Sequence, residues 1–568
     1  MEQNPKLTSS ITQLITSAVV GLFFGVVVSV VAHFFVEGVL FLSSIRTSFF
    51  LVQFSGIELS FGHIVTLTIA AVLIYAIRKF LKVDRWQGPA DTIYEAHRPD
   101  NELNVKVGLA STLAAFVSAS GGASVGQYGP LVHFGAVIGS GLKRFISDKF
   151  STDVFIGCGV AAAISAGFGA PIAGVIFAHE AILRHFSLRA IAPIAIASCV
   201  AAGTSELLWP GESLFEISTF SGDLSTLLLS ALFFGPFFGI VAVTFMHSVR
   251  FTASLVPKYR ITPGISLILA VVLTSLGGIF VPEALGLGGD TVKAIINQSY
   301  PVFYLVALLL MKIALTSTSI GFGLFGGVFS PSLLVGAAAG GLALSLTEIM
   351  GLGMFSSVGL IVCGMAAVSS SVIGAPIAGV LIVMELTGSY EFALLAMISV
   401  VTAVLTSHLV FGQSFFDRQL ADRGIDIAGG RTVIEMMERP ILNVANQEYT
   451  SLDSEMSCSG AIKLIVNNGH TEAYLLDLHK IFLGKTSLTS LLSADEHTKL
   501  SDCIEQDPIT IKHDASLQQA MEAAASFVGE SIPIIDRNSK IMIGVITEAD
   551  IFQDYLALQN RVVDLEKR

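Results

Sequence analysis

Two glycine–proline breaks interrupt long apolar stretches of this chain, and they constrain its fold more than any other feature. Residues 126–130 read Gly-Gln-Tyr-Gly-Pro, and residues 327–331 read Gly-Val-Phe-Ser-Pro. Glycine permits close backbone approach, and proline favours the first turn of a helix. Both breaks are therefore expected to begin helices at bilayer depth. Two helix N-termini aimed at one buried point would hold an anion through their unpaired N–H groups.

The composition predicts an integral membrane protein with a soluble tail. Of the 568 residues, 53% are hydrophobic and 13% are charged, whereas soluble domains average about 25% charged residues. Residues 431–568 hold 33 of the 76 charged residues, so we expect a membrane domain over residues 1–430 and a soluble domain over residues 431–568. The net charge of −12 argues against nucleic acid as a partner.

The N-terminal region is expected to be a retained helix. No charged residue occurs between Lys6 and Glu37, a stretch that is too long for a signal peptide and long enough to span a bilayer. We therefore expect a plasma membrane or a bacterial inner membrane as the location. The five cysteines lack metal or disulfide spacing, so no metal site is expected. No nucleophile–base set and no phosphate loop is evident, so an enzyme is not expected.

Fourteen apolar segments predict helices in the first 430 residues. They lie near residues 11–43, 63–79, 106–119, 131–143, 154–164, 171–183, 189–203, 223–247, 264–280, 301–318, 331–347, 357–368, 376–387 and 392–411. Several hold only about 10–14 residues, whereas a full span needs roughly 20. Short helices persist at bilayer depth only when they are buried in protein or line a wet cavity. The pattern predicts an all-α polytopic membrane domain with short, broken helices.

The membrane domain contains an internal repeat. Residues 170–174 read Ala-Pro-Ile-Ala-Gly, residues 375–379 repeat this pentamer, and a glutamate follows each copy at the same distance, Glu180 and Glu385. The offset is 205 residues here and 201 residues for the two breaks. These matches predict two halves, at about 60–210 and 220–415, related as the inverted repeats of transporters are. The alternative is chance recurrence of a common helix-break composition.

The tail contains two βαβ-like units. The second shows a helix at 515–527, strands at 531–536 and 542–546, and a helix at 548–555; the first, within 456–490, shows strands at 473–476 and 481–483. Neither unit could bury its sheet alone, so we expect the two to pack into one soluble α/β module.

Taken together, these motifs resemble the CLC family of chloride channels and chloride/proton antiporters, and the tail resembles a tandem pair of cystathionine-β-synthase (CBS) domains. The resemblance covers nearly the whole chain in the right order. It implies an inverted-repeat CLC-type fold, with a cytoplasmic CBS tail. It also implies a homodimer in the lipid bilayer, with a separate pore for chloride or a similar small anion in each subunit.

The resemblance also implies an anion pathway. In the second break, Phe329 would lend its backbone N–H to a bound anion, and Phe416 stands where the family has a central tyrosine. The family's first signature is badly degraded here, so the residues in its place are weakly matched anion contacts. The implied pathway residues are Gly126, Gln127, Tyr128, Gly129, Pro130, Gly327, Val328, Phe329, Ser330, Pro331 and Phe416, with Gln87, Gly88 and Pro89 as the weakly matched contacts.

Three departures from the family pattern bear on its chemistry. Tyr128 stands in place of the gating glutamate, Gln127 in place of the preceding cation, and Ala181 in place of the internal glutamate of proton-coupled members. Tyrosine has an ordinary pKa near 10, and alanine cannot titrate. We therefore predict passive chloride permeation without proton coupling, with Tyr128 and Phe416 as gates. The alternatives are a proton-coupled antiporter that uses other titratable groups, a dead pore in which Tyr128 only packs, and a nucleotide-sensing protein with a vestigial pore.

Five polar residues within the expected membrane segments invite both structural and functional interpretations. Glu180 and Glu385 are expected to cap neighbouring helices rather than move protons. His133 and His179 are expected to be hydrogen-bonded structural residues, with a substitute proton site as the alternative. Lys312 either draws chloride into the inner vestibule or pairs with an acid.

In the tail, Thr547 and Asp550 match the ribose contacts of a CBS nucleotide site, whereas the other repeat has Ser490 in place of the acid. We expect at most one adenine nucleotide per subunit and no required cofactor. A purely structural dimerising module is the alternative.

Overall fold

The computed structural model describes residues 5–48, 51–54, 57–60, 62–98, 103–143, 152–186, 188–210, 223–349, 358–427, 429–494, 498–505 and 508–567. The expected start of the second half, residue 220, lies outside these described residues. The chain divides into two compact units at Gly424–Ile425, and each unit is described by itself.

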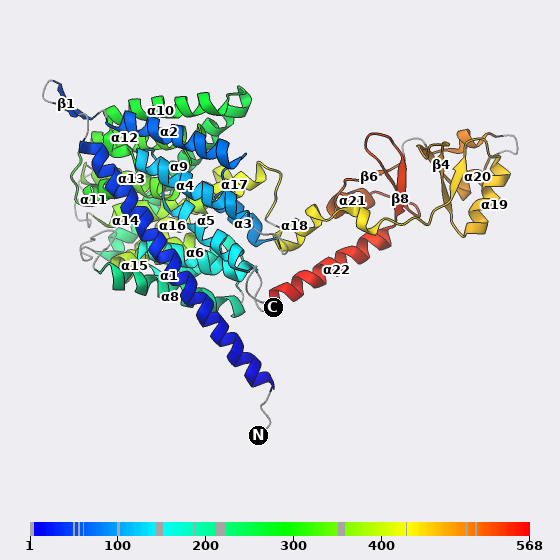
Figure 1. Ribbon diagram of the computed structural model, residues 1–568, viewed down its shortest axis with the longest axis horizontal. Helices are drawn as coiled ribbons and strands as arrows, with labels where there is room; N and C mark the ends of the chain where they lie inside the picture. The colour runs from blue at the N-terminus through cyan, green and yellow to red at the C-terminus, as the bar shows by residue number, and fades with distance from the viewer. Residues whose placement is uncertain are drawn as a thin grey trace. The chain divides into compact units, whose positions relative to one another are not determined.

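The larger unit is a bundle of helices (Figure 1). Its helices are α1 (Pro5–Ser48), α2 (Gly62–Leu81), α3 (Pro89–Ala96), α4 (Val105–Gly121), α5 (Tyr128–Lys143), α6 (Thr152–Phe168), α7 (Pro171–Phe177), η1 (Ala178–Leu183), α8 (Leu188–Leu208), α9 (Leu224–Lys258), α10 (Pro263–Phe280), η2 (Pro282–Ala284), α11 (Gly289–Ile296), α12 (Val302–Gly321), α13 (Phe329–Ile349), α14 (Gly359–Ile373), α15 (Pro376–Thr387), α16 (Tyr390–Phe411) and α17 (Phe415–Ala421). A short hairpin of β1 (Leu51–Phe54) and β2 (Ile57–Ser60) follows α1.

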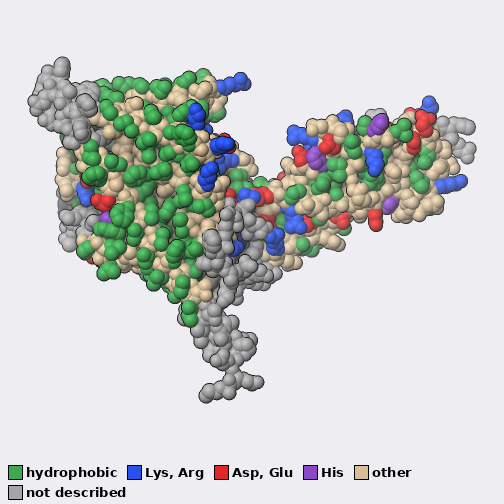
Figure 2. Space-filling view, in the orientation of Figure 1, with side chains coloured by type: hydrophobic (Ala, Val, Ile, Leu, Met, Phe, Trp, Pro, Cys, Tyr) green, Lys and Arg blue, Asp and Glu red, His purple; other side chains and the backbone are tan. Residues whose placement is uncertain are grey.

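The lengths of these helices confirm the expected mixture of full spans and short helices. Among the described residues, eight helices are long and apolar enough to cross a membrane, and five apolar helices are shorter. Apolar side chains cover much of the visible face of this unit, while acidic and basic side chains are frequent on the smaller unit (Figure 2). The larger unit therefore has the exterior of a protein surrounded by lipid.

Glycines allow the same helix packing in both halves. A Cβ atom on Gly135 of α5 would lie 2.2 Å from the carbonyl oxygen of Gly159 on α6. In the second half, a Cβ atom on Gly336 of α13 would lie 2.3 Å from the carbonyl oxygen of Gly364 on α14. Each crossing thus brings two backbones into contact, as small residues permit in membrane helix pairs. The expected repeat is a structural repeat.

The smaller unit holds two sheets of the same topology. Its elements are α18 (Gly430–Glu438), η3 (Ile441–Val444), β3 (Ser451–Asp453), α19 (Cys458–Asn468), β4 (Glu472–Leu476), β5 (Phe482–Ser487), α20 (Leu488–Leu492), η4 (Leu500–Cys503), β6 (Ile511–Lys512), α21 (Leu517–Ala524), β7 (Ile532–Ile535), β8 (Met542–Ile546) and α22 (Glu548–Lys567). In each sheet the middle strand pairs parallel with the first strand and antiparallel with the third, in the orders β3-β4-β5 and β6-β7-β8.

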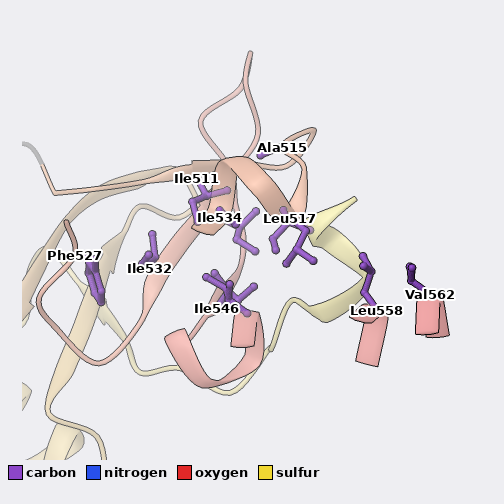
Figure 3. Packing of buried hydrophobic residues seen from close by; sticks show 12 residues of the cluster. Ile511, Ala515, Leu517, Phe527, Ile532, Ile534, Ile546, Leu558 and Val562 are labelled. Carbon is purple, nitrogen blue, oxygen red and sulfur yellow. The ribbon is translucent and has the colours of Figure 1, made fainter. Parts of the chain in front are cut away.

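Apolar contacts join these sheets to their helices and to each other. One core cluster packs Ile532, Ile534 and Ile546 of the second sheet against Leu517 and Leu558 (Figure 3). Another cluster contains residues of both sheets, because β4 and β8 both contribute to it. The expected packing of the two βαβ-like units of the tail into one module is confirmed.

Candidate functional site

The two glycine–proline breaks meet in space. The N–H of Gly126 donates to the carbonyl of Gly327 at 2.7 Å, and the N–H of Gly327 donates to the carbonyl of Gly126 at 2.8 Å. This pair of hydrogen bonds joins segments that are 201 residues apart in the sequence. Since α5 begins at Tyr128 and α13 begins at Phe329, the structure brings two helix N-termini together at one buried place.

These N-termini present amide groups that their own helices do not use. The first intrahelical donors are Leu131, which donates to the carbonyl of Gln127 at 3.1 Å, and Ser332, which donates to the carbonyl of Val328 at 3.0 Å. The N–H groups before them have no acceptor within the helix. Proline at positions 130 and 331 removes one further donor from each turn. The junction thus offers a few N–H groups and the positive ends of two helix dipoles.

Three aromatic rings pack at this junction. The Tyr128 ring stacks on Phe168 with a centroid separation of 4.0 Å, and it meets Phe329 edge-on at 5.4 Å. Phe168 and Phe329 are 5.0 Å apart. All three side chains are buried. The sequence did not single out Phe168, although the repeat contained a signal: Phe168 precedes the first Gly-Ala-Pro break at the position where the second half has Ile373.

A cavity of about 240 Å³ adjoins the junction. Its lining includes Gln127, Tyr128 and Ser330 together with residues 282–283 and 285–293. In the part of the chain that the structure describes, Gln127 Oε1 and Ser330 Oγ are buried without a hydrogen-bond partner. Polar groups held in a buried cavity without protein partners suit a bound ion or water.

Charged residues also line this cavity. They are Glu283, Asp290 and Lys293. The Glu283 carboxylate accepts a hydrogen bond from the hydroxyl of Tyr304 on α12. This part of the lining therefore carries two acids and one base.

The structure places Phe416 on α17, in a different environment. Ser414 caps this helix by accepting a hydrogen bond from the N–H of Asp417 at 3.2 Å. The Phe416 side chain is buried, and its ring lies 6.0 Å from that of Phe415. Among the described residues, no ring contact joins Phe416 to Tyr128, Phe168 or Phe329.

The degraded signature lies against the first break but is already occupied by a carboxylate. A Cβ atom on Gly129 would lie 3.4 Å from Pro89 Cγ, so the start of α3 adjoins α5. The N–H of Gly88 donates to Asp91 Oδ2 at 2.9 Å. Asp91 also receives hydrogen bonds from Arg85 at 2.6 Å and Arg423 at 2.9 Å. Because its own acid caps this N-terminus, α3 is a poorer anion site than α5 or α13.

Each of the two repeat glutamates caps the start of a helix in the other half of the membrane unit. Glu180 accepts hydrogen bonds from the N–H groups of Ile377 at 2.9 Å and Ala378 at 2.8 Å, at the start of α15. Glu385 accepts matching bonds, also at 2.9 and 2.8 Å, at the start of α7. The expected capping role is confirmed. Ala181, next to Glu180, is buried on η1.

The two expected structural histidines are hydrogen-bonded. His133 Nδ1 lies 2.8 Å from Thr92 Oγ1, and His179 Nδ1 lies 2.9 Å from the carbonyl oxygen of His185. In each ring, Nε2 is buried without a partner among the described residues. Lys312 bonds backbone carbonyls, and no described acid pairs with it. Of the two interpretations of Lys312, pairing with an acid is therefore wrong for the described part of the chain.

In the tail, Thr547 and Asp550 bond each other. The N–H and hydroxyl of Thr547 donate to Asp550 Oδ2 at 3.0 and 2.7 Å, and the N–H of Asp550 donates to Thr547 Oγ1 at 3.1 Å. Thr547 also lines a cavity of about 150 Å³ whose other walls include Glu448, Glu472 and Glu530. Burial alone would raise the pKa of Glu530, but hydrogen bonds from the backbone N–H and the hydroxyl of Thr471 lower that pKa. Glu472 is paired with Lys485 at 2.7 Å, so Glu448 and Glu530 are the acids of this cavity that disfavour phosphate.

Metal ligation finds no support in the described residues, which contain no group of three or more histidines, cysteines, aspartates or glutamates that could hold a metal ion.

Two sequence families match the chain. The pattern of the voltage gated chloride channel family matches residues 69–408, which is more than half of the chain, and that of the CBS domain matches residues 500–556. A putative chloride channel protein, ClcB-like, from Ralstonia nicotianae is 27% identical over 336 residues, 57% of this chain and 76% of that protein. The voltage-gated ClC-type chloride channel ClcB of Escherichia coli (strain K12 / DH10B) is 26% identical over 361 residues, 62% of this chain and 84% of that protein.

Solved structures share the fold. A slow cyanobacterial Cl⁻/H⁺ antiporter superposes with a TM-score of 0.63 at 18% identity, covering 72% of this chain and 99% of that chain. A CLC-type fluoride/proton antiporter gives 0.61 at 22% identity, covering 73% and 98%. A eukaryotic CLC transporter gives 0.61 at 18% identity, covering 95% and 98%. The expected fold class, an inverted-repeat membrane domain with a C-terminal CBS pair, is confirmed.

Proposed function

We propose that this chain, which belongs to the voltage gated chloride channel family, conducts chloride passively and without proton coupling. Anion transport is the function of the family; the absence of coupling is the proposal. The observation that carries it is Tyr128, which replaces the family's gating glutamate and packs against both Phe168 and Phe329. Ala181, which replaces the internal glutamate, supports the same conclusion. Neither side chain can pick up and release a proton at neutral pH as a carboxylate does.

The proposed path runs through the junction of α5 and α13. Chloride enters the cavity beside Gln127 and Ser330, whose side chains can donate hydrogen bonds to it. It then passes the free N–H groups at the two helix starts, which bind an anion weakly enough to release it. Tyr128 is a neutral lid on this path, held by its stack on Phe168. Passage requires that the ring move, so gating and permeation share one side chain.

Simultaneous flux and pH measurements test the proposal. Proteoliposomes loaded with chloride should release it when a potassium ionophore clamps the voltage, while the external pH stays constant. Uphill proton movement driven by a chloride gradient would contradict the proposal and would favour an antiporter.

Two variants at Tyr128 sharpen this test. Tyr128→Ala removes the lid and should raise chloride flux. Tyr128→Glu restores the family's titratable group, so its flux should fall as the pH rises, because the carboxylate competes with chloride for the amides. Equal flux in the native protein and both variants would show that this side chain is not on the path.

An antiporter that uses other titratable groups is the second candidate. The unpartnered Nε2 atoms of His133 and His179 favour it, because a buried imidazole near the path could carry protons. Two of the structural neighbours are also named as proton-coupled antiporters. Loss of proton movement in His133→Gln or His179→Gln, with chloride flux retained, would support this candidate.

We further propose the family's setting for this chain: a homodimer in a bacterial inner membrane, with a cytoplasmic CBS tail that needs no cofactor. Adenine nucleotide at Thr547 and Asp550 would make the tail a sensor. The acidic cavity predicts weak binding or none. Titration of ATP and AMP against the native protein and Asp550→Ala tests this, because tight binding that survives the substitution would place the site elsewhere.

A further inference from the structure

Lys312 is a fully buried basic residue that the proposed mechanism has not used. It lies in the middle of α12 with no exposed surface, and Ile313 and Leu309 beside it are buried too. An ionised side chain inside a membrane protein is costly and normally has a partner of opposite charge. In the part of the chain that the structure describes, no carboxylate pairs with Lys312. Its charge therefore lacks a counter-ion within the described protein.

The atoms that Lys312 does contact belong to the wall of the cavity beside the junction. Its Nζ donates to the carbonyls of Ala284 and Gly286, both at 3.0 Å. Gly286 lines the cavity, as Gln127 does. Lys312 therefore lies behind residues that line the cavity. Hydrogen bonds to two backbone carbonyls hold its amino group there.

The same carbonyl segment is tied to the chain that leads into α5. Ser124 Oγ donates to the carbonyl of Ala284 at 2.9 Å, and the N–H of Gly286 donates to the carbonyl of Gly122 at 3.3 Å. Ser124 Oγ also lies 3.0 Å from Thr316 Oγ1, one turn along α12 from Lys312. The charged group is therefore held in a fixed place relative to the first break.

The cavity needs more positive charge than Lys293 in its lining supplies. Gln127 stands where the family motif has a cation, and two lining acids, Glu283 and Asp290, outnumber Lys293. We propose that Lys312 provides this charge from behind the wall and sets the affinity of the cavity for chloride, with the bound anion as its counter-ion. This inference rests on the proposed anion path, but it holds whether or not transport is coupled to protons.

Chloride binding to the full-length protein in detergent, measured by isothermal titration calorimetry, tests the role of Lys312. Lys312→Gln keeps N–H donors for the two carbonyls and removes the charge, so the Kd for chloride should rise at least tenfold. Lys312→Arg keeps the charge and should stay within about threefold of the native Kd. Lys79→Met removes the same charge from an exposed site on α2 and should leave the Kd unchanged. Unchanged affinity in Lys312→Gln, as an uncharged native amine would give, overturns the inference.

A rescue experiment separates charge from structural support. Gln127→Lys in the Lys312→Gln background returns a cation to the cavity from the motif position and should restore at least half of the lost binding free energy. Failure of this rescue, with normal thermal unfolding, would show a structural role and overturn the inference. If Lys312→Gln does not fold, Gln127→Lys alone should tighten chloride binding at least threefold, and no change would count against the inference.

Flux and pH measured on the same preparations distinguish the two claims. Proton-coupled flux in the native protein, together with weaker chloride binding in Lys312→Gln, would contradict passive conduction and support the role of Lys312. Passive flux in the native protein, together with unchanged chloride affinity in Lys312→Gln, would support passive conduction and contradict the role of Lys312. A native protein that neither binds nor conducts chloride would contradict both.

Discussion

The two halves of the membrane unit share a scaffold. Glu180 and Glu385 make matching pairs of hydrogen bonds to each other's halves. Gly135 and Gly336 permit matching close approaches between neighbouring helices. Both constraints act on the backbone. Each glutamate caps a helix of the other half, so a substitution in one half would leave backbone N–H groups of the other half without an acceptor.

The halves differ in the side chains at the junction. The first break carries Tyr128 with Phe168 stacked on it, whereas the second carries Phe329, and Ile373 occupies the position that matches Phe168. The comparison teaches that the scaffold is duplicated while the stacked aromatic pair, which we propose as the gate, belongs to one half. The first three predictions below each test one side of this contrast, and the fourth concerns the tail.

The largest expected effect concerns the glycine crossings. Gly135→Ala and Gly336→Ala should each lower the free energy of unfolding by at least about 3 kcal/mol, because the added Cβ would meet backbone atoms that cannot rotate away. Thermal unfolding in detergent measures this loss. Gly203→Ala on α8 is the control, since its Cβ would meet open space. A large loss in only one half would break the claim of a shared scaffold.

Removal of the reciprocal caps should have a smaller and equal effect. Glu180→Gln and Glu385→Gln each replace one acceptor oxygen with an NH₂ group that faces a backbone N–H, which should cost about 1–3 kcal/mol of stability. Differential scanning fluorimetry can compare the two variants. Glu206→Gln, at an exposed position, should leave the melting temperature unchanged. Melting temperatures that fall for one glutamate and not the other would contradict the mutual capping.

Making the first half resemble the second should loosen the gate. Phe168→Ile removes the ring stacked on Tyr128, and such pairs contribute about 0.5–1.5 kcal/mol beyond burial, so chloride flux should rise about 2- to 10-fold. Reconstituted flux measures this change. Phe303→Ile, on the exposed surface of α12, should leave flux unchanged. Equal flux in Phe168→Ile and the native protein would show that the stack does not hold the gate.

The smallest expected effect concerns the hairpin turn between β7 and β8 in the tail. Hydrogen bonds from the backbone and hydroxyl of Ser539, and from the N–H of Asn538, lower the pKa of Asp536 to about 2. Because the pKa is lower in the folded protein, this carboxylate stabilises the tail above its ordinary pKa near 3.9, and the stabilisation is lost as the pH falls through about 2. The difference in unfolding midpoint between the native protein and Asp536→Asn should therefore be full at pH 6 and shrink below pH 4. A difference that does not change with pH would show that the charge is not responsible.

The sequence predicted the long-range features of the fold because they depend on composition and repetition. All fourteen apolar segments form helices, and the matched pentamers with Glu180 and Glu385 revealed the duplication. The short helices α3 and α11 were not anticipated, because each has only eight residues and mixes polar with apolar residues.

The candidate site was predictable only as far as the motifs extend. Residues 126–130 and 327–331 were identified, and their meeting follows from the repeat. The stack of Phe168 on Tyr128, the acid that caps α3 and the carbonyls that hold Lys312 depend on contacts between distant segments. Apolar sequence around each of these residues gives no local sign of its partner.

The reversal potential of the reconstituted native protein tests the central claim most directly. With a chloride gradient and an opposing proton gradient across a planar bilayer, passive conduction predicts a reversal potential equal to the chloride equilibrium potential. That potential should not move when the pH on one side changes. A reversal potential that shifts with the proton gradient would show coupled exchange, and it would contradict the conclusion that Tyr128 and Ala181 have removed the proton path.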